Sequence, residues 1–112
     1  MVINVYERYY KADAVFSGIR RHGALVMLIS DSEAGNITYK AAVTFFPHTD
    51  AEDFAVSYDA YFEEVLYSSK GRRSRKREAA YLEQLPEIID RIAEENNAAV
   101  FWDEPLREER RG

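Results

Sequence analysis

Apolar and polar residues alternate along the first half of the chain, a pattern that is typical of β-strands. In residues 2–10, polar side chains fall on both faces, which predicts a strand at a sheet edge or at an interface. A short second strand is expected over residues 14–19, followed by a polar connection over residues 20–23. Residues 24–29 are all apolar, which predicts a central strand that is buried on both faces.

The clearest half-buried strand covers residues 37–45, in which apolar Ile37, Tyr39 and Val43 share one face. Turn-forming residues fill positions 31–36 before it. Pro47 follows it and should end the strand, because proline has no N–H to donate to a neighbouring strand.

A first helix is expected to run from Thr49 to about Lys70. Thr49 and Glu52 have the spacing of a capping box, and apolar residues then recur at steps of four, three and four through Val65. The competing interpretation is a strand with period-two alternation over residues 54–62. We favour the helix because the cap and the acidic residues at its start agree with the longer apolar stripe.

A second helix is expected over residues 74–96, with Leu82, Leu85, Ile89 and Ile92 in its apolar stripe. Pro86 lies inside this stripe and should kink the helix without ending it, because the stripe keeps its phase. Residues 98–102 then predict a short final strand.

Together these elements predict one α+β domain over residues 1–106, with the order β-β-β-β-α-α-β. An antiparallel sheet of four to five strands would carry the helical pair on one face, which buries both apolar stripes. The charged tail, residues 107–112, is expected to be frayed.

The composition excludes several classes of protein. The chain has 112 residues and no cysteine, which excludes a disulfide scaffold and a thiolate zinc site and is typical of a reducing compartment. No export signal is visible in residues 1–10, and the longest apolar run is far shorter than the roughly 20 residues that cross a bilayer. We therefore expect a cytoplasmic protein that does not enter a membrane.

Charge is unevenly distributed. The net charge is −5, yet six of the 15 basic residues lie in residues 70–77, and the rest of the chain has nine basic residues against 20 acidic ones. Clustered cations of this kind bind phosphate backbones. The candidate contacts are Lys70, Arg72, Arg73, Arg75, Lys76 and Arg77. The competing interpretation is a solvated loop, or a patch paired with acidic surface of this chain or of a second copy.

No pattern in the sequence predicts a metal site or a cofactor. His22 and His48 fall in expected loops and lack the spacing that puts two ligands on one helical face. The nucleophile elbow, the phosphate-binding glycine loop and the dinucleotide fingerprint do not occur.

Two acidic pairs, Glu63-Glu64 and Asp103-Glu104, are the remaining candidates for catalysis. An acid or base role would require one carboxyl group of a pair to lie in a desolvating pocket. The first pair is better explained as a solvated face, and the second stands beside Trp102. We do not expect an enzyme.

Aromatic residues are plentiful, with eight Tyr, six Phe and one Trp. Tyr6, Tyr9 and Tyr10 could form a protein interface, or could cover the exposed face of the sheet itself. The sequence thus predicts a small non-enzymatic binding or regulatory protein, whose partner is another protein or a second copy of itself. The alternative function is binding of nucleic acid or another polyanion through residues 70–77.

Overall fold

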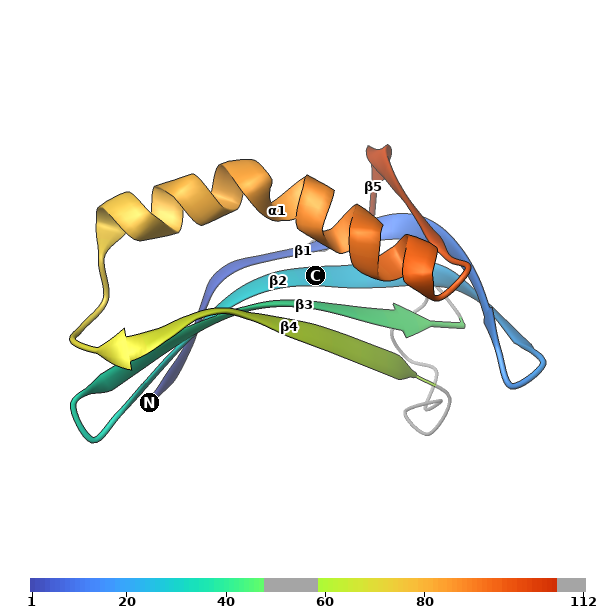
Figure 1. Cartoon of the computed structure of the whole chain (residues 1–112). Helices are drawn as coiled ribbons and strands as arrows, with labels where there is room; N and C mark the ends of the chain where they lie inside the picture. The colour runs from blue at the N-terminus through green and yellow to red at the C-terminus, as the bar shows by residue number, and fades with distance from the viewer. Residues whose placement is uncertain (48–58, 107–112) are drawn as a thin grey trace, which may run out of the picture.

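The computed structural model describes residues 1–47 and 59–106, and Figure 1 shows one sheet with a helix along one of its faces. The sheet is antiparallel and has the strand order β4-β3-β2-β1-β5. The elements are β1 (Val2–Phe16), β2 (Ile19–Glu33), β3 (Asn36–Phe46), β4 (Ala60–Lys70), α1 (Arg75–Glu95) and β5 (Ala99–Pro105). The α+β class and the antiparallel sheet agree with the expectation from sequence, whereas the helical pair does not.

Two-residue turns join the first three strands. Ser17 and Gly18 both have positive φ, as do Ala34 and Gly35, which is the backbone of the hairpin turn that matches the twist of adjacent strands. The expected connection over residues 20–23 is wrong, because these residues belong to β2. The polar side chains there continue the strand alternation, with His22 exposed and Arg21 buried.

The first predicted helix is wrong for residues 60–70, which form strand β4 beside β3. The competing period-two interpretation holds in this part: Phe62 and Leu66 pack against the core, whereas Tyr61 and Val65 are exposed. Aromatic and β-branched residues favour a pleated strand here, and pairing with β3 decides the conformation. The expected cap at Thr49 and the rest of that prediction, up to residue 58, lie outside the described residues.

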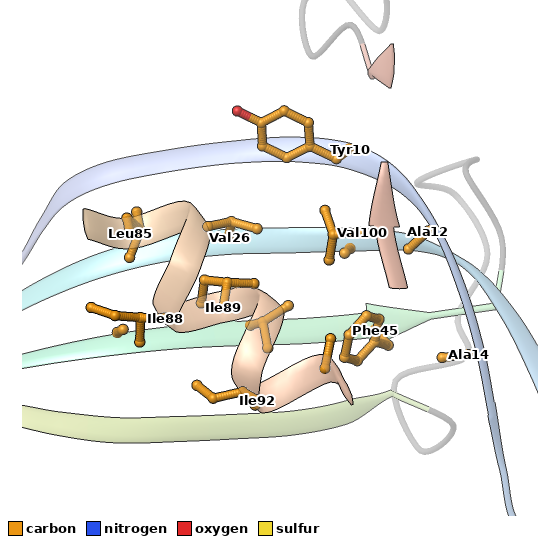
Figure 2. Close-up of a cluster of buried hydrophobic side chains, with 14 of the residues drawn as sticks. Tyr10, Ala12, Ala14, Val26, Phe45, Leu85, Ile88, Ile89, Ile92 and Val100 are labelled. Atoms are coloured by element: carbon orange, nitrogen blue, oxygen red, sulfur yellow. The ribbon is translucent and has the colours of Figure 1, made fainter. Parts of the chain in front are cut away.

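The second predicted helix is confirmed as α1, to within one residue at each end. Ser74 is its N-cap and accepts a hydrogen bond at Oγ from the Arg77 amide, and Asn96 is its C-cap. The helix continues through Pro86, as the unbroken phase of the stripe indicated. Leu85, Ile88, Ile89 and Ile92 point from α1 into the core, where Figure 2 shows them facing Val26 and Phe45 of the sheet.

The final strand was also expected, and β5 returns to the sheet beside β1. β1 is therefore an edge strand only in its first half, because Tyr10 to Asp13 are paired with β5. The edge position expected for residues 2–10 is therefore confirmed over most of that range and is wrong at Tyr10. β2 is central, as predicted. In the described part of the chain, no helix is long and apolar enough to cross a membrane.

Candidate functional site

The face of the sheet opposite α1 is the first candidate site, and we call it the open face. Successive residues of a strand point to opposite faces. Ala24, Val26 and Leu28 of β2 belong to the buried cluster under α1. Leu25 and Met27 therefore point to the open face, where both are half-buried.

Strand register defines the open face as three cross-strand rows, since paired residues lie on the same side of a sheet. The rows are Tyr9–Leu25–Thr44–Tyr61, Glu7–Met27–Ala42–Glu63 and Asn4–Ile29–Lys40–Val65. Their centre, on β2 and β3, is mostly apolar, and the charged residues lie on or beside the outer strands. An apolar centre inside a polar rim is the usual anatomy of a protein interface.

The outer apolar residues of the open face are well exposed. Val65 is 55% and Tyr61 is 49% exposed. Their charged neighbours are already paired, since Lys40 Nζ lies 3.6 Å from a carboxylate oxygen of Glu63 and the Tyr61 hydroxyl donates to Glu63 at 2.7 Å. The face therefore has little uncompensated charge at its β4 side.

Gly23 provides a flat place on this face for an aromatic ring. It pairs with Phe46 across the strands, and a Cβ atom on residue 23 would lie only 2.3 Å from the Phe46 ring. The Phe46 ring also meets Tyr9 edge to face, with centroids 6.0 Å apart. Residue 23 is glycine because the ring lies directly over its backbone.

The three tyrosines proposed as an interface do not lie together. Tyr9 is on the open face, whereas Tyr6 and Tyr10 face the side of the core, where their hydroxyl groups are 2.7 Å apart. Tyr10 is 7% exposed and packs against Trp102. Burial raises the pKa of Tyr10 to about 12. Tyr6 and Tyr9 are both half-buried but lie on opposite faces of the sheet, so the three tyrosines do not form one surface.

The second candidate site is the basic segment, residues 70–77, where β4 ends and α1 begins. Arg73 donates from Nε and Nη2 to the carboxylate of Glu78, at 2.8 and 3.0 Å. Glu78 is only 6% exposed and also accepts from the Tyr39 hydroxyl at 2.7 Å. That hydroxyl in turn accepts from the Ser74 amide at 3.0 Å, so the network joins β3 to the start of the helix.

The hydrogen bonds from Arg73, and then that from Tyr39, hold the pKa of Glu78 below its ordinary value, although burial acts in the opposite direction. Glu78 is therefore ionised at neutral pH. Arg73 therefore has a structural role, because replacing it would leave the buried carboxylate of Glu78 without a charged partner.

The other basic residues of the segment differ in their contacts. Arg77 stacks over the Tyr67 ring, with its guanidinium carbon 3.8 Å from the centroid. Lys70, Arg72, Arg75 and Lys76 are exposed, and none of them forms an ion pair within residues 1–47 and 59–106. Arg75 also lines a shallow pocket of about 280 Å³ together with Arg73 and Glu78. Arg73 and Arg77 are exposed as well, but they already contact Glu78 and Tyr67.

The weaker candidates from the sequence are not brought together. His22 is exposed, His48 lies outside the described residues, and no group of three metal-ligating side chains occurs among the residues that are described. Glu64 receives both its hydrogen bonds from Arg91, on the opposite side of the sheet from Glu63. The acidic pair is thus divided between two ion pairs.

Asp103 and Glu104 are both exposed, and Glu104 lies 3.6 Å from Lys11. The indole N–H of Trp102 donates to Asp90 at 2.8 Å, so its polar edge is used by the helix. Acid or base catalysis would need a desolvating pocket, and the described part of the chain does not form one around this pair.

Comparison with protein-family models, with curated proteins and with solved structures finds no match for this chain. The candidate sites therefore rest on geometry alone. Sequence reasoning singled out the basic segment but missed Leu25 and Met27 as surface residues. The signal was present in the apolar run of residues 24–29, which predicted burial on two faces.

Proposed function

We propose that this chain is a non-enzymatic docking protein that binds another polypeptide through the open face. One observation carries the proposal: β2 is apolar on both of its faces, while α1 covers one. Where one face of an antiparallel sheet meets water, its outward residues are usually polar. Leu25 and Met27 depart from that rule: both are apolar and half-buried on the open face, between Gly23 and Ile29, which are already buried.

The rim of the open face also suits docking. Aromatic residues and methionine are enriched in the centres of interfaces, and lysine and glutamate are depleted there. Met27 on β2 and Phe46 on β3 lie between Glu7 on β1 and Glu63 on β4, which agrees with this distribution; Lys40 on β3 is the exception. The proposed activity is thus binding, with the apolar rows supplying affinity and the charged rim limiting orientation.

Oxidation of Met27 tests this proposal, because peroxide converts an accessible thioether to a sulfoxide. The variant Leu82→Met adds a reference methionine on the exposed side of α1, by a substitution that conserves volume. In a lysate of the source cell, Met27 should oxidise several-fold more slowly, relative to this reference methionine, than in dilute purified protein. Equal ratios in the two samples would refute docking at this face.

The second candidate function is binding of nucleic acid or another polyanion by the basic segment. It is favoured by four exposed cations, Lys70, Arg72, Arg75 and Lys76, that form no ion pair with the described residues of a chain that is otherwise acidic. The ion pair of the buried Glu78 is made by Arg73, and Arg75 acts on that carboxylate only through its charge, without an ion pair. Phosphate contacts would give them a use.

The test is fluorescence anisotropy with labelled single-stranded and duplex oligonucleotides at two salt concentrations. Replacing Arg72, Arg75 and Lys76 with Ala should weaken binding to every sequence and reduce the salt slope by about two to three. A control that replaces Arg8, Lys11 and Arg20 with Ala removes equal charge elsewhere and should bind more tightly than the first variant. Equal losses of affinity in the two variants would mean that the loss comes from the change in net charge and not from the basic segment.

A further inference from the structure

We infer that the partner at the open face is a second copy of this chain, packed sheet against sheet. This inference rests on the proposed function and specifies the polypeptide that the open face binds. Two facing sheets bury their inner side chains when they lie about 10 Å apart. In such a dimer, β2 is buried on both faces, which is the environment that the apolar run of residues 24–29 predicts.

Charge on the open face favours a copy of the same surface. A two-fold interface places each patch against itself, so a patch with net charge would repel its own copy. The whole chain carries −5, but the open face is close to balanced. Lys40 is paired with Glu63 at 3.6 Å, and Lys11 at one end with Glu104 at 3.6 Å. At the other end, Asp31 lies 3.9 Å from the terminal ammonium group of residue 1.

Glu7 is the remaining charge in the three rows, and it accepts a hydrogen bond from Asn4 at 3.2 Å. It lies in β1, toward the side of the face opposite Glu63. A two-fold axis that runs along β2 near Met27 would place Glu7 of one copy over β3 of the other, on the side where Lys40 forms its ion pair with Glu63. The face therefore contains cations and anions in an arrangement that can meet itself.

The size of the face is sufficient for a dimer of ordinary stability. Four strands spaced about 4.8 Å apart and a length of about nine residues at roughly 3.3 Å each give a footprint on the order of 500 Å². Accessible surface exceeds the projected footprint, because Tyr61 and Val65 stand out from the sheet. The buried area thus approaches the roughly 800 Å² per partner of a standard interface.

The first experiment is sedimentation equilibrium of the full chain over a wide range of concentrations. The unaltered protein should have twice the mass of one chain at micromolar concentration. Met27→Glu should raise the dissociation constant of the dimer at least tenfold, because two carboxylates would meet at the centre. The matched control Leu82→Glu introduces the same charge on the exposed side of α1 and should leave the dimer intact.

Val65→Glu provides a second variant that does not depend on tolerance at the central strand. Val65 is 55% exposed on edge strand β4, so this change should leave the fold intact, as circular dichroism can verify. It should also weaken the dimer, by less than Met27→Glu. If both variants fold and keep the mass of the dimer, another surface makes the contact and the inference fails.

Met27 oxidation in the Leu82→Met background separates this inference from the function on which it rests. Protection of Met27 that rises with the concentration of pure protein supports a second copy at the open face. A protein that stays monomeric, with Met27 protected only in lysate, overturns the second copy but keeps docking to a different partner. If Met27 is protected neither in concentrated pure protein nor in lysate, the inference and the proposed function are both overturned. A dimer that doubles the mass without protecting Met27 joins through a strand edge and overturns the inference as well.

Discussion

Val26 and Met27 are neighbours in β2, but they belong to different environments. Val26 is fully buried beneath α1, whereas Met27 is half-buried on the open face. The covered face of the sheet carries Ala, Val, Leu and Phe side chains that meet five buried apolar residues of the helix. The open face has comparable apolar side chains, and no helix of the described residues covers it.

This difference shows that apolar residues on a strand mark every surface that is buried when the protein functions, including surfaces that become buried only on association. Burial of apolar area stabilises whichever state removes it from water. On the covered face, that state is the folded chain. On the open face, we propose that it is the complex, so the two faces should respond differently to the same kind of substitution.

The largest effect is expected from Ile89→Ala on the covered face. Ile89 is fully buried between α1 and the sheet, so truncation leaves a cavity and should lower the free energy of unfolding by about 2 to 5 kcal/mol. Met27→Ala, measured by urea denaturation at a concentration that keeps the protein monomeric, should cost less than half as much. Equal costs would mean that the open face is already as well packed as the covered one within one chain.

The next effect concerns Glu78, which links the covered face to the start of α1. At pH 6, Glu78→Gln should lower the free energy of unfolding by about 1 to 3 kcal/mol, because the buried side chain at position 78 loses its charged hydrogen bonds with Arg73. Tyr39→Phe, which removes the hydroxyl between Glu78 and Ser74, should act in the same direction.

The pH dependence of that effect has a definite sign. The pKa of Glu78 is lower in the folded chain than its ordinary value of 4.5, so the unfolded chain binds a proton more readily. The stabilisation is therefore complete above pH 4.5 and is lost as the pH falls toward the folded pKa. Urea denaturation at pH 6, 4 and 3 should show the difference between the native chain and Glu78→Gln shrinking. A difference in the free energy of unfolding that does not change with pH would mean that the effect comes from packing.

The sequence predicted the strand over residues 37–45 and α1 well, because these elements follow from local alternation and from a long apolar stripe with caps at Ser74 and Asn96. The separate strand expected over residues 14–19 was wrong, because residues 17 and 18 form the turn between β1 and β2. The prediction was also wrong for residues 60–70, where Phe62 and Leu66 fit a helical stripe as well as a strand face. The pairing of these residues with β3 decides the matter, and a contact between distant segments leaves no trace in a short local pattern.

Each candidate site likewise has a part that the sequence revealed and a part that it did not. The basic segment was visible as six cations in eight residues, but the separate role of Arg73 depends on Tyr39, which is 39 residues from Glu78 along the chain. The open face was visible as the apolar run of residues 24–29. The sequence could not show that α1 covers one side of that run and that no helix of residues 1–47 and 59–106 covers the other.

A moderate effect is expected from Gly23→Ala, which tests the packing of Phe46 on the open face. The new methyl group would lie 2.3 Å from the ring, so the ring must move outward. Because the ring is the far end of a side chain on an uncovered face, the cost to unfolding should be only about 1 kcal/mol. The displaced ring should also weaken association of the chain. A loss of about 3 kcal/mol or more would show that Phe46 cannot move.

The smallest effect is expected from Ser30→Ala on the covered face, where it should be favourable. Ser30 is fully buried, and its Oγ is the buried side-chain polar atom without a hydrogen-bond partner among the described residues. Replacing a hydroxyl that has no partner removes a desolvation cost, so unfolding should require a few tenths to about 1 kcal/mol more free energy. Thr38→Ala is the matched control, because its hydroxyl pairs with Ser68 at 3.1 Å and lies on the other side of the sheet. In thermal denaturation, Ser30→Ala should have a higher midpoint temperature than the native chain, and Thr38→Ala an unchanged or lower one. A lower midpoint for Ser30→Ala would mean that a water molecule or a further donor reaches the Ser30 hydroxyl. The covered face would then be less dry than its apolar lining indicates.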